Sequence, residues 1–204
     1  MTAAFTLDQL ADMVQDDAGF EFKRKKFVDP FEVKKAYEVT ITEQAVTESK
    51  NGWLQLEITL EAGGNKAKRW IMLPIFTEDK QSSEDPEKLA QMKQSAGTSL
   101  HSLLRAVDPE VFSVYSTIDK SGARWTFYDA EGNEISSEEK KLREKLVAKA
   151  VIATAELLRC DKASLVGQTC FYVRTEDARD TTKTYHNFYP AAPDNYELAE
   201  IVPF

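Results

Sequence analysis

Apolar and polar side chains alternate in three segments of the first half of the chain. The clearest run is 53–62, "WLQLEITLEA", whose apolar positions on one face are Leu54, Leu56, Ile58 and Leu60. Residues 33–47 alternate in the same way around Val39, and residues 66–76 do so around Trp70. A period of two is that of a strand with one buried face, so the pattern predicts three β-strands.

Short turn signals separate these strands. "SKNG" (49–52) lies between the first two, and "GGN" (63–65) lies between the second and the third. Glycine adopts positive φ at little cost, which tight hairpin turns require. The three segments are therefore expected to form an antiparallel meander.

The middle of the chain changes to helical spacing. Asp85 followed by Pro86 is typical of a helix start, and apolar residues then recur every three or four positions as far as Val107. Ser136 and Glu139 form a capping-box sequence ahead of a second amphipathic helix. The apolar stripe of this helix comprises Leu142, Leu146, Val147, Ala150, Val151, Thr154, Leu157 and Leu158. Residues 111–128, between the helices, fit either a small hairpin or an irregular insertion.

Two more strands are predicted in residues 164–177 and 181–191, joined by the polar turn "EDARD". The predicted fold class is mainly β with helical additions (α+β). Specifically, we expect a five-stranded Greek-key barrel of the oligonucleotide-binding (OB) type, with a helix-containing insertion between strands 3 and 4. Residues 1–192 would form this single domain, with the insertion at about 84–160, and residues 193–204 would form an acidic and hydrophobic tail.

The composition is that of a compact folded protein. The chain has 204 residues, of which 42% are hydrophobic, enough for one substantial core. Its apolar runs are too short to cross a membrane. The first twenty residues contain four aspartates, which does not fit a secretory signal. Cys160 and Cys170 lack a metal-binding spacing, so we expect reduced core thiols.

The charge is acidic overall but unevenly distributed. The net charge is -8, whereas proteins that bind nucleic acid usually carry a basic surface. Basic residues nevertheless cluster at 23–26, at 34–35 and at 66–69, the last beside a tryptophan. Each cluster fits either a solvated patch or part of a local groove for a polyanion.

Alternation also predicts which strand side chains face outward from the barrel, opposite the aliphatic core. Cations on this wall would neutralise phosphates, and flat rings would stack on unpaired bases at about 1–3 kcal/mol per base. The alternative is that bulky rings such as Trp70 and Tyr172 cap the core. The candidate nucleic-acid-binding residues are Lys23, Arg24, Lys25, Lys26, Trp53, Lys66, Lys68, Arg69, Trp70, Tyr172, Arg174, Lys183 and Tyr185.

The strand sequences resemble a known family. "AYEVTI", "NGWLQLEITL", "RWIMLPI" and the late "LVGQTCFYVRTED...KTYHNFYPA" are similar to phage-encoded single-stranded DNA-binding proteins with an OB-fold. The resemblance covers roughly 33–76 and 164–192, while 108–160 departs from a minimal OB-fold. It implies a non-enzymatic protein of the host cytoplasm that coats and protects single-stranded DNA in replication, recombination or repair.

The end of the chain, "ELAEIVPF", looks like the acidic, Pro-Phe-terminated tip by which bacterial single-stranded DNA-binding proteins recruit partners. The ring of Phe204 would fill an apolar pocket, and its carboxylate would pair with a basic residue. The alternative is a last strand whose apolar residues fill the barrel, although Pro203 would interrupt its ladder. The partner-binding residues that the resemblance implies are Glu197, Glu200, Ile201, Val202, Pro203 and Phe204.

Other function classes stay open at this point. A protein-interaction or assembly module without nucleic-acid binding would explain the acidic balance. A metal-dependent nuclease could use Glu57 and Glu61, but no third ligand is evident. His101 and His186 accompany no nucleophile motif, so we expect no catalytic residues, no metal and no cofactor. We also expect no membrane partner, and whether the chain forms a homo-oligomer stays open.

Overall fold

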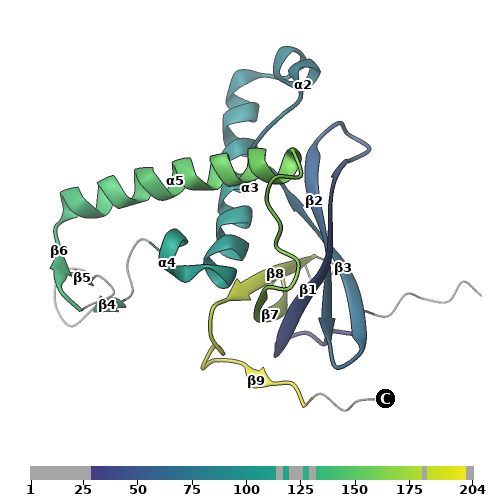
Figure 1. Cartoon of the computed structure of the whole chain (residues 1–204), viewed down its shortest axis with the longest axis vertical. Coiled ribbons are helices and arrows are strands. Elements are labelled where there is room, and N and C mark those ends of the chain that lie inside the picture. Colours follow the sequence, from purple (N-terminus) through teal and green to yellow (C-terminus); the bar gives the residue numbers. More distant parts are fainter. Residues whose placement is uncertain (1–28, 114–116, 120–125, 129–131, 181–182, 201–204) are drawn as a thin grey trace, which may run out of the picture.

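The computed structural model describes residues 29–113, 117–119, 126–128, 132–180 and 183–200 (Figure 1). Its strands are β1 (Lys35–Glu48), β2 (Leu54–Ala62), β3 (Asn65–Met72), β4 (Thr117–Asp119), β5 (Thr126–Tyr128), β6 (Glu134–Ile135), β7 (Thr169–Glu176), β8 (Thr184–Tyr189) and β9 (Glu197–Leu198). Its helices are α2 (Glu78–Ser83), α3 (Pro86–Val107), α4 (Pro109–Phe112) and α5 (Ser137–Arg159). The described residues thus confirm the mixed α+β class.

The main sheet is built from the five long strands that the alternation predicts. Their order is β3-β2-β1-β7-β8, every neighbouring pair is antiparallel, and the short β9 adds a parallel pair with β1. The β2–β3 hairpin closes at Ala62 and Asn65 through Gly63 and Gly64, whose φ values are 55° and 81°. The predicted meander is confirmed, together with its glycine turn.

The sheet is strongly curved but does not close into the predicted barrel. Within the described residues, β3 pairs only with β2 and β8 pairs only with β7. The register of β1 shifts between Ile41 and Glu43, and an irregularity of this kind bends a strand. The curvature brings Nε of Arg69 on β3 to 2.7 Å from Oη of Tyr172 on β7, although β2 and β1 lie between them. A gap therefore remains where β3 and β8 would meet in a closed barrel.

Two long helices form in the insertion, as predicted. The Asp85 side chain accepts hydrogen bonds from the backbone N–H groups of Glu87 and Lys88 at the start of α3. Helix α3 lies against the sheet and contacts β3, β7 and β8. The Ser136 hydroxyl caps α5 by accepting from Glu139 N at 3.1 Å. Helix α5 crosses α3, and its N-terminal half extends away from the sheet (Figure 1).

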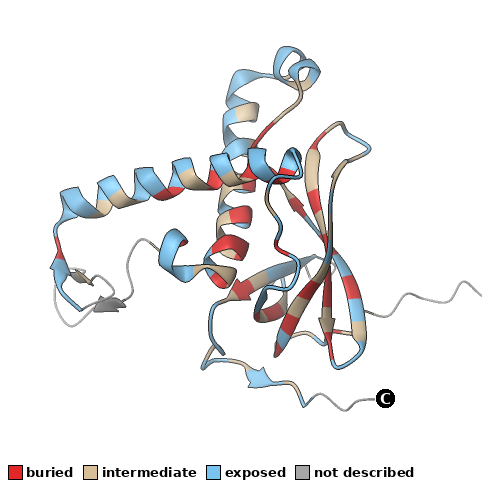
Figure 2. Cartoon of the chain, in the orientation of Figure 1, coloured by how far each residue is buried: buried red, intermediate tan, exposed pale blue. Residues whose placement is uncertain are grey.

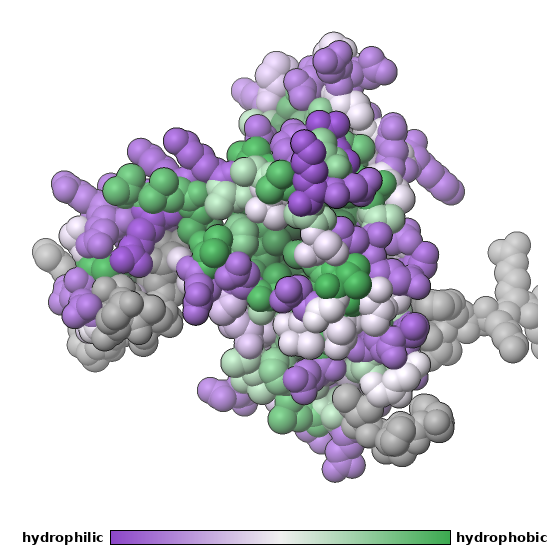
Figure 3. Space-filling view, in the orientation of Figure 1, coloured by the Kyte–Doolittle hydropathy of each residue, from purple (hydrophilic) through white to green (hydrophobic). Residues whose placement is uncertain are grey.

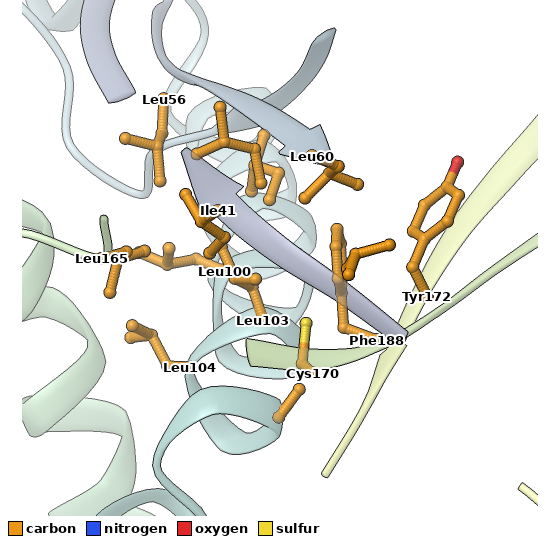
Figure 4. Packing of buried hydrophobic residues seen from close by; sticks show 14 of the residues in the cluster. Ile41, Leu56, Leu60, Leu100, Leu103, Leu104, Leu165, Cys170, Tyr172 and Phe188 are labelled. Carbon is orange, nitrogen blue, oxygen red and sulfur yellow. The ribbon is translucent and has the colours of Figure 1, made fainter. Parts of the chain in front are cut away.

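The hydrophobic core lies between the sheet and these helices. Figure 4 shows Ile41, Leu56 and Leu60 of the sheet facing Leu100 and Leu103 of α3, and all five side chains are fully buried. Helix α5 contributes a single buried face of Val147, Val151, Ala155 and Leu158. Burying a leucine or isoleucine of this kind stabilises the fold by about 1.5–3 kcal/mol. Much of α5 is exposed outside this face (Figure 2).

Local structure departs from the predictions in three places. Residues 78–83, between the third predicted strand and the predicted helix start at Asp85, form the short helix α2, which no periodicity indicated. The described residues of 111–128 include the end of α4 and strands β4 and β5, which join β6 in a small sheet of order β4-β5-β6, so a single hairpin is only part of this region. Cys170 is a buried free thiol, but Cys160 directly follows α5 and is exposed, so its prediction as a core thiol is wrong.

The beginning of the predicted tail lies against β1. Strand β9 pairs in parallel with Lys35 and Ala36, and Ala199 N donates to Ala36 O at 2.9 Å. The alternative of a last strand is therefore correct for 197–198, but Leu198 is exposed and does not fill the core. Ile201, Val202, Pro203 and Phe204 lie outside the described residues.

Candidate nucleic-acid interface

Lys66, Lys68 and Trp70 share the outer face of β3, and we call these three residues the β3 surface. They alternate with buried Ala67 and Arg69, as a strand with one solvated face requires. The Trp70 side chain is unusually open for a tryptophan, with 53% of its surface exposed. The predicted outward orientation of Lys68 and Trp70 is confirmed, and Lys66 of the basic cluster shares their face.

Carboxylates on β2 already hold all three side chains of the β3 surface. Glu57 lies opposite Trp70 in the ladder, its Oε2 accepts from Trp70 Nε1 at 2.9 Å, and its Oε1 lies 2.5 Å from Lys68 Nζ. Glu61 pairs with Lys66 at 3.0 Å. The hydrogen bonds from Lys68 and Trp70 lower the pKa of Glu57, and those with Glu57 and Glu61 raise the pKa values of the two lysines. Because exposed ion pairs contribute little to stability, another anion can compete for these cations.

A hollow of about 650 Å³ runs from the β3 surface toward β8. It therefore lies at the gap between the two unpaired strand edges. On β3 its lining includes the β3 surface together with Ala67 and Arg69. The lining residues from β8 are Thr184 and His186, and the remaining ones are Asp29, Glu43 and Thr59.

The hollow adjoins a network of polar groups that we call the Arg69 network: Asp29, Arg69, Tyr172, Arg174 and His186, of which Arg69 and Tyr172 are buried. The Arg69 side chain is 6% exposed, and its Nη2 donates to both carboxylate oxygens of Asp29 at 2.8 Å. Asp29 also pairs with Arg174 Nη1 at 2.9 Å. One carboxylate thus lies between two guanidinium groups and offsets one of their two positive charges.

The pKa of Asp29 reflects these contacts. Partial burial alone would raise it, but hydrogen bonds from Phe31 N, Arg69 and Arg174 outweigh this effect and lower the pKa below its ordinary value. The carboxylate is therefore ionised at neutral pH. Asp29 fixes Arg69 as a structural cation, in contrast to the exposed lysines of the β3 surface.

Tyr172 links the Arg69 network to the exposed edge at β8. Its Oη accepts from Arg69 Nε and lies 2.7 Å from Nδ1 of His186, so the tyrosine proton is donated to Nδ1. That bond requires an unprotonated Nδ1. Burial of the ring against Tyr172, followed by the charge of Arg69, lowers the pKa of His186 to about 4, although part of the residue reaches solvent. Burial raises the pKa of Tyr172 to about 12.

Trp53 and Tyr172 do not face outward, so this part of the predicted binding wall is wrong. Tyr172 is fully buried, because the Cys170–Tyr172 face of β7 is the concave one that α3 covers. Trp53 is 7% exposed and packs edge-on against Phe76, with Lys80 Nζ 4.7 Å from its ring centroid. Rings that are enclosed in this way cannot stack on a base, so we exclude both from the binding surface.

The other predicted residues lie in different surroundings. Arg69 lines the hollow and Arg174 is half-buried, but both are committed to Asp29. Lys183 and Tyr185 are exposed on the β7–β8 hairpin, where Lys183 pairs with Asp180 at 3.2 Å and Tyr185 Oη donates to Asp177 at 2.6 Å. The predicted cluster Lys23, Arg24, Lys25 and Lys26 lies outside the described residues.

Sequence reasoning missed Asp29 and His186 as parts of the site. Asp29 precedes the first strand and belongs to no periodic pattern, so its partners could not be found from spacing. Tyr185 was predicted to bind DNA, and His186 is the next residue along β8, so its side chain points to the opposite face of the sheet. This alternation was the one signal in the sequence that could have placed His186 on the same face as Tyr172.

Searches for related proteins and for metal sites add no further assignment. No protein-family model and no curated protein matches the chain. In the part of the chain that the structure describes, no group of three or more His, Cys, Asp or Glu side chains is arranged to hold a metal ion. None of the described helices is both long and apolar enough to cross a membrane.

Proposed function

We propose that the protein binds single-stranded DNA along the β3 surface and the adjoining hollow. One observation carries this proposal: an open indole, Trp70, lies on the same strand face as Lys66 and Lys68, beside a hollow of about 650 Å³. Lysines neutralise backbone phosphates, and an exposed indole stacks on a base. By binding in this way the protein would coat and protect exposed strands in replication, recombination or repair.

The surface favours single strands over duplexes for a geometric reason. Lys68 and Trp70 are two residues apart on one strand, which places their side chains about 7 Å apart. A phosphate on the lysine and an unpaired base on the indole can therefore belong to neighbouring positions of one strand. In a duplex the base faces are hidden by stacking, so only the lysine contact would remain.

The acidic balance of the chain limits the expected affinity and its salt dependence. With a net charge of -8, long-range attraction of a polyanion is absent, and binding relies on the local cations. If Lys66 and Lys68 each neutralise one phosphate, log K should fall with log salt with a slope of about -1.4. A slope near zero would mean that phosphates are not bound.

The topology supports an OB-like architecture as part of this proposal. Five long antiparallel strands, with a helical insertion between the third and the fourth, are the elements of such a Greek key. OB-folds are described as partly open barrels, and they bind oligonucleotides along strands 2 and 3. The β3 surface occupies the corresponding third strand.

We include partner recruitment through the C-terminal tip in the proposal. Glu197, Leu198 and Glu200 are exposed where the chain leaves β1, which supports a role for this end outside the core. Deletion of Phe204 should abolish binding of a partner with a basic, apolar pocket and leave DNA affinity unchanged. A large loss of thermal stability on this deletion would show instead that the end belongs to the fold.

The test is a tryptophan-fluorescence titration with single-stranded oligo-dT and with a duplex of the same length. We expect quenching at micromolar protein and low salt for the single strand, and much weaker binding of the duplex. Absence of quenching with oligo-dT would leave a protein-interaction module as the better function. Incubation of the same oligonucleotide with magnesium or manganese, followed by gel analysis, tests for a nuclease, which would shorten the strand.

A further inference from the structure

Helix α5 carries a second apolar face, separate from the one that packs on the core. The core face consists of Val147, Val151, Ala155 and Leu158. The second face, which we call the α5 stripe, consists of Leu142, Leu146, Ala153 and Leu157, and the exposed fractions of its leucines are 58%, 56% and 44%. Figure 3 shows apolar side chains over α5 at the upper left, bordered by hydrophilic ones. Exposed apolar patches with a polar rim mark interaction sites on many soluble proteins.

The α5 stripe is symmetric along the helix. Its members are separated by four, seven and four residues, so the stripe has a midpoint between Lys149 and Ala150. With 3.6 residues per turn, all four side chains fall within a sector of about 60°. A stripe with this symmetry presents the same pattern when it is turned end over end.

We propose that the α5 stripe binds the α5 stripe of a second copy of the protein, with the two helices antiparallel. A two-fold axis through the midpoint places Leu142 of one copy against Leu157 of the other, and Leu146 against Ala153. Two leucines then meet at each end of the contact, and near its centre the small Ala153 leaves room for Leu146, so the helices can approach closely. Such an isologous contact is the commonest form of protein self-association.

The charges beside the α5 stripe favour the antiparallel orientation. Lys145, Lys149 and Glu156 lie along one edge of it, and in the described residues neither lysine contacts a carboxylate. In an antiparallel pair this edge faces itself, so Lys145 of one copy lies beside Glu156 of the other, twice in the dimer, while the two Lys149 side chains meet once near the axis. In a parallel pair this edge would instead face the opposite edge of the partner's stripe, and Lys145 and Glu156 would not be brought together. Glu156 forms an exposed pair with Arg159 at 2.8 Å, which it can exchange.

The surroundings leave the α5 stripe accessible. Lys140 Nζ lies 4.6 Å from the centroid of the Phe127 ring, so β5 is on the core side of α5, about two-fifths of a turn from the stripe. The N-terminal half of α5 also extends away from the sheet (Figure 1). One helix pair is at the small end of specific interfaces, so the dimer should dissociate on dilution.

Sedimentation equilibrium over a range of protein concentrations tests the proposal. We expect a monomer–dimer equilibrium for the wild-type protein and at least a tenfold weaker association for Leu146→Glu. Val111→Glu is the matched control, because Val111 is 55% exposed but lies on α4, outside the stripe. Circular dichroism verifies that both variants keep their helix content. A wild-type protein that stays monomeric at hundreds of micromolar, or a Leu146→Glu variant that associates normally, would overturn the proposal.

Cysteine cross-linking in a Cys160→Ser background tests the orientation. Residue 149 lies next to the two-fold axis, so Lys149→Cys of one copy should form a disulfide with Lys149→Cys of the other copy under mild oxidation. Leu142→Cys should cross-link only to Leu157→Cys, when the two single variants are mixed. Efficient cross-linking of Leu142→Cys to itself would show a parallel pair and contradict the antiparallel arrangement. These readouts need no DNA, so they are independent of the proposed nucleic-acid binding.

Discussion

Trp70 Nε1 donates a hydrogen bond to Glu57 across the β2–β3 ladder, at 2.9 Å. The same carboxylate also holds Lys68. Glu57 therefore occupies the position beside Lys68 that a backbone phosphate would take in the proposed complex. In the free protein this carboxylate would be an internal competitor of the proposed DNA ligand.

Replacement of Glu57 by glutamine should strengthen DNA binding. The amide still accepts from Trp70, but it no longer attracts Lys68 or repels a phosphate, so we expect affinity for oligo-dT to rise about threefold at low salt. Glu110→Gln makes the same charge change on α4, away from the hollow. An equal gain in both variants, measured by fluorescence titration, would mean that only net charge matters.

Removal of the indole should weaken binding more than removal of one lysine. Trp70→Ala deletes a stacking platform that contributes about 1–3 kcal/mol, and Lys68→Ala deletes one phosphate contact. We expect Lys68→Ala to reduce the salt slope by about 0.7, while Trp70→Ala leaves the slope unchanged. Fluorescence anisotropy of a labelled oligonucleotide measures both variants, and Trp53→Phe serves as the control, since Trp53 is buried. Unchanged affinity in Trp70→Ala would place the binding surface elsewhere.

Asp29→Asn should destabilise the fold strongly. The substitution leaves the buried Arg69 guanidinium without its carboxylate, and removing one partner of a buried pair costs about 3 kcal/mol or more. Asp180→Asn breaks the exposed pair with Lys183 and should cost less than about 1 kcal/mol. Urea unfolding followed by circular dichroism compares the two. Equal midpoints would show that the Arg69 network contributes nothing to stability.

Stability should fall as the pH drops from about 6.5 to about 4. His186 has a folded-state pKa of about 4, below the ordinary value of 6.5, so in this interval the unfolded chain binds the additional proton. Protonation of Nδ1 would also reverse the direction of its hydrogen bond with Tyr172, whose Oη would then accept from both Nδ1 and Arg69 Nε. His186→Asn keeps an acceptor but no titrating group, so its melting temperature should depend less on pH in this window. An identical pH profile for both proteins would contradict the assigned pKa, which NMR titration of the imidazole measures directly.

The sequence predicted most of the fold because its signals are local. Strict alternation defined the buried face of β2 correctly, and the caps at Asp85 and Ser136 defined the starts of α3 and α5. Closure of the sheet could not be predicted in this way, because it depends on the register shift in β1 and on how far β3 and β8 approach. Those are properties of the assembled sheet.

The candidate site was predicted only in part, and the reason is physical. Alternation shows which residues share a face, and it placed Lys68 and Trp70 together correctly. Alternation cannot show which face of a strand is buried when consecutive residues on both faces are buried, as Tyr172 and Val173 of β7 are. The Arg69 network depends on contacts between residues far apart in the chain, such as Asp29 and Arg174, and no local pattern encodes them.

The absence of a ladder between β3 and β8 bears on how a polymer would be loaded. The hollow at this gap and the β3 surface beside it both present exposed side chains on the outside of the sheet. A strand could therefore be laid on them from the side, at any point along its length and without a free end. Covalently closed circles and internal stretches of a long genome would then be substrates as good as short linear fragments.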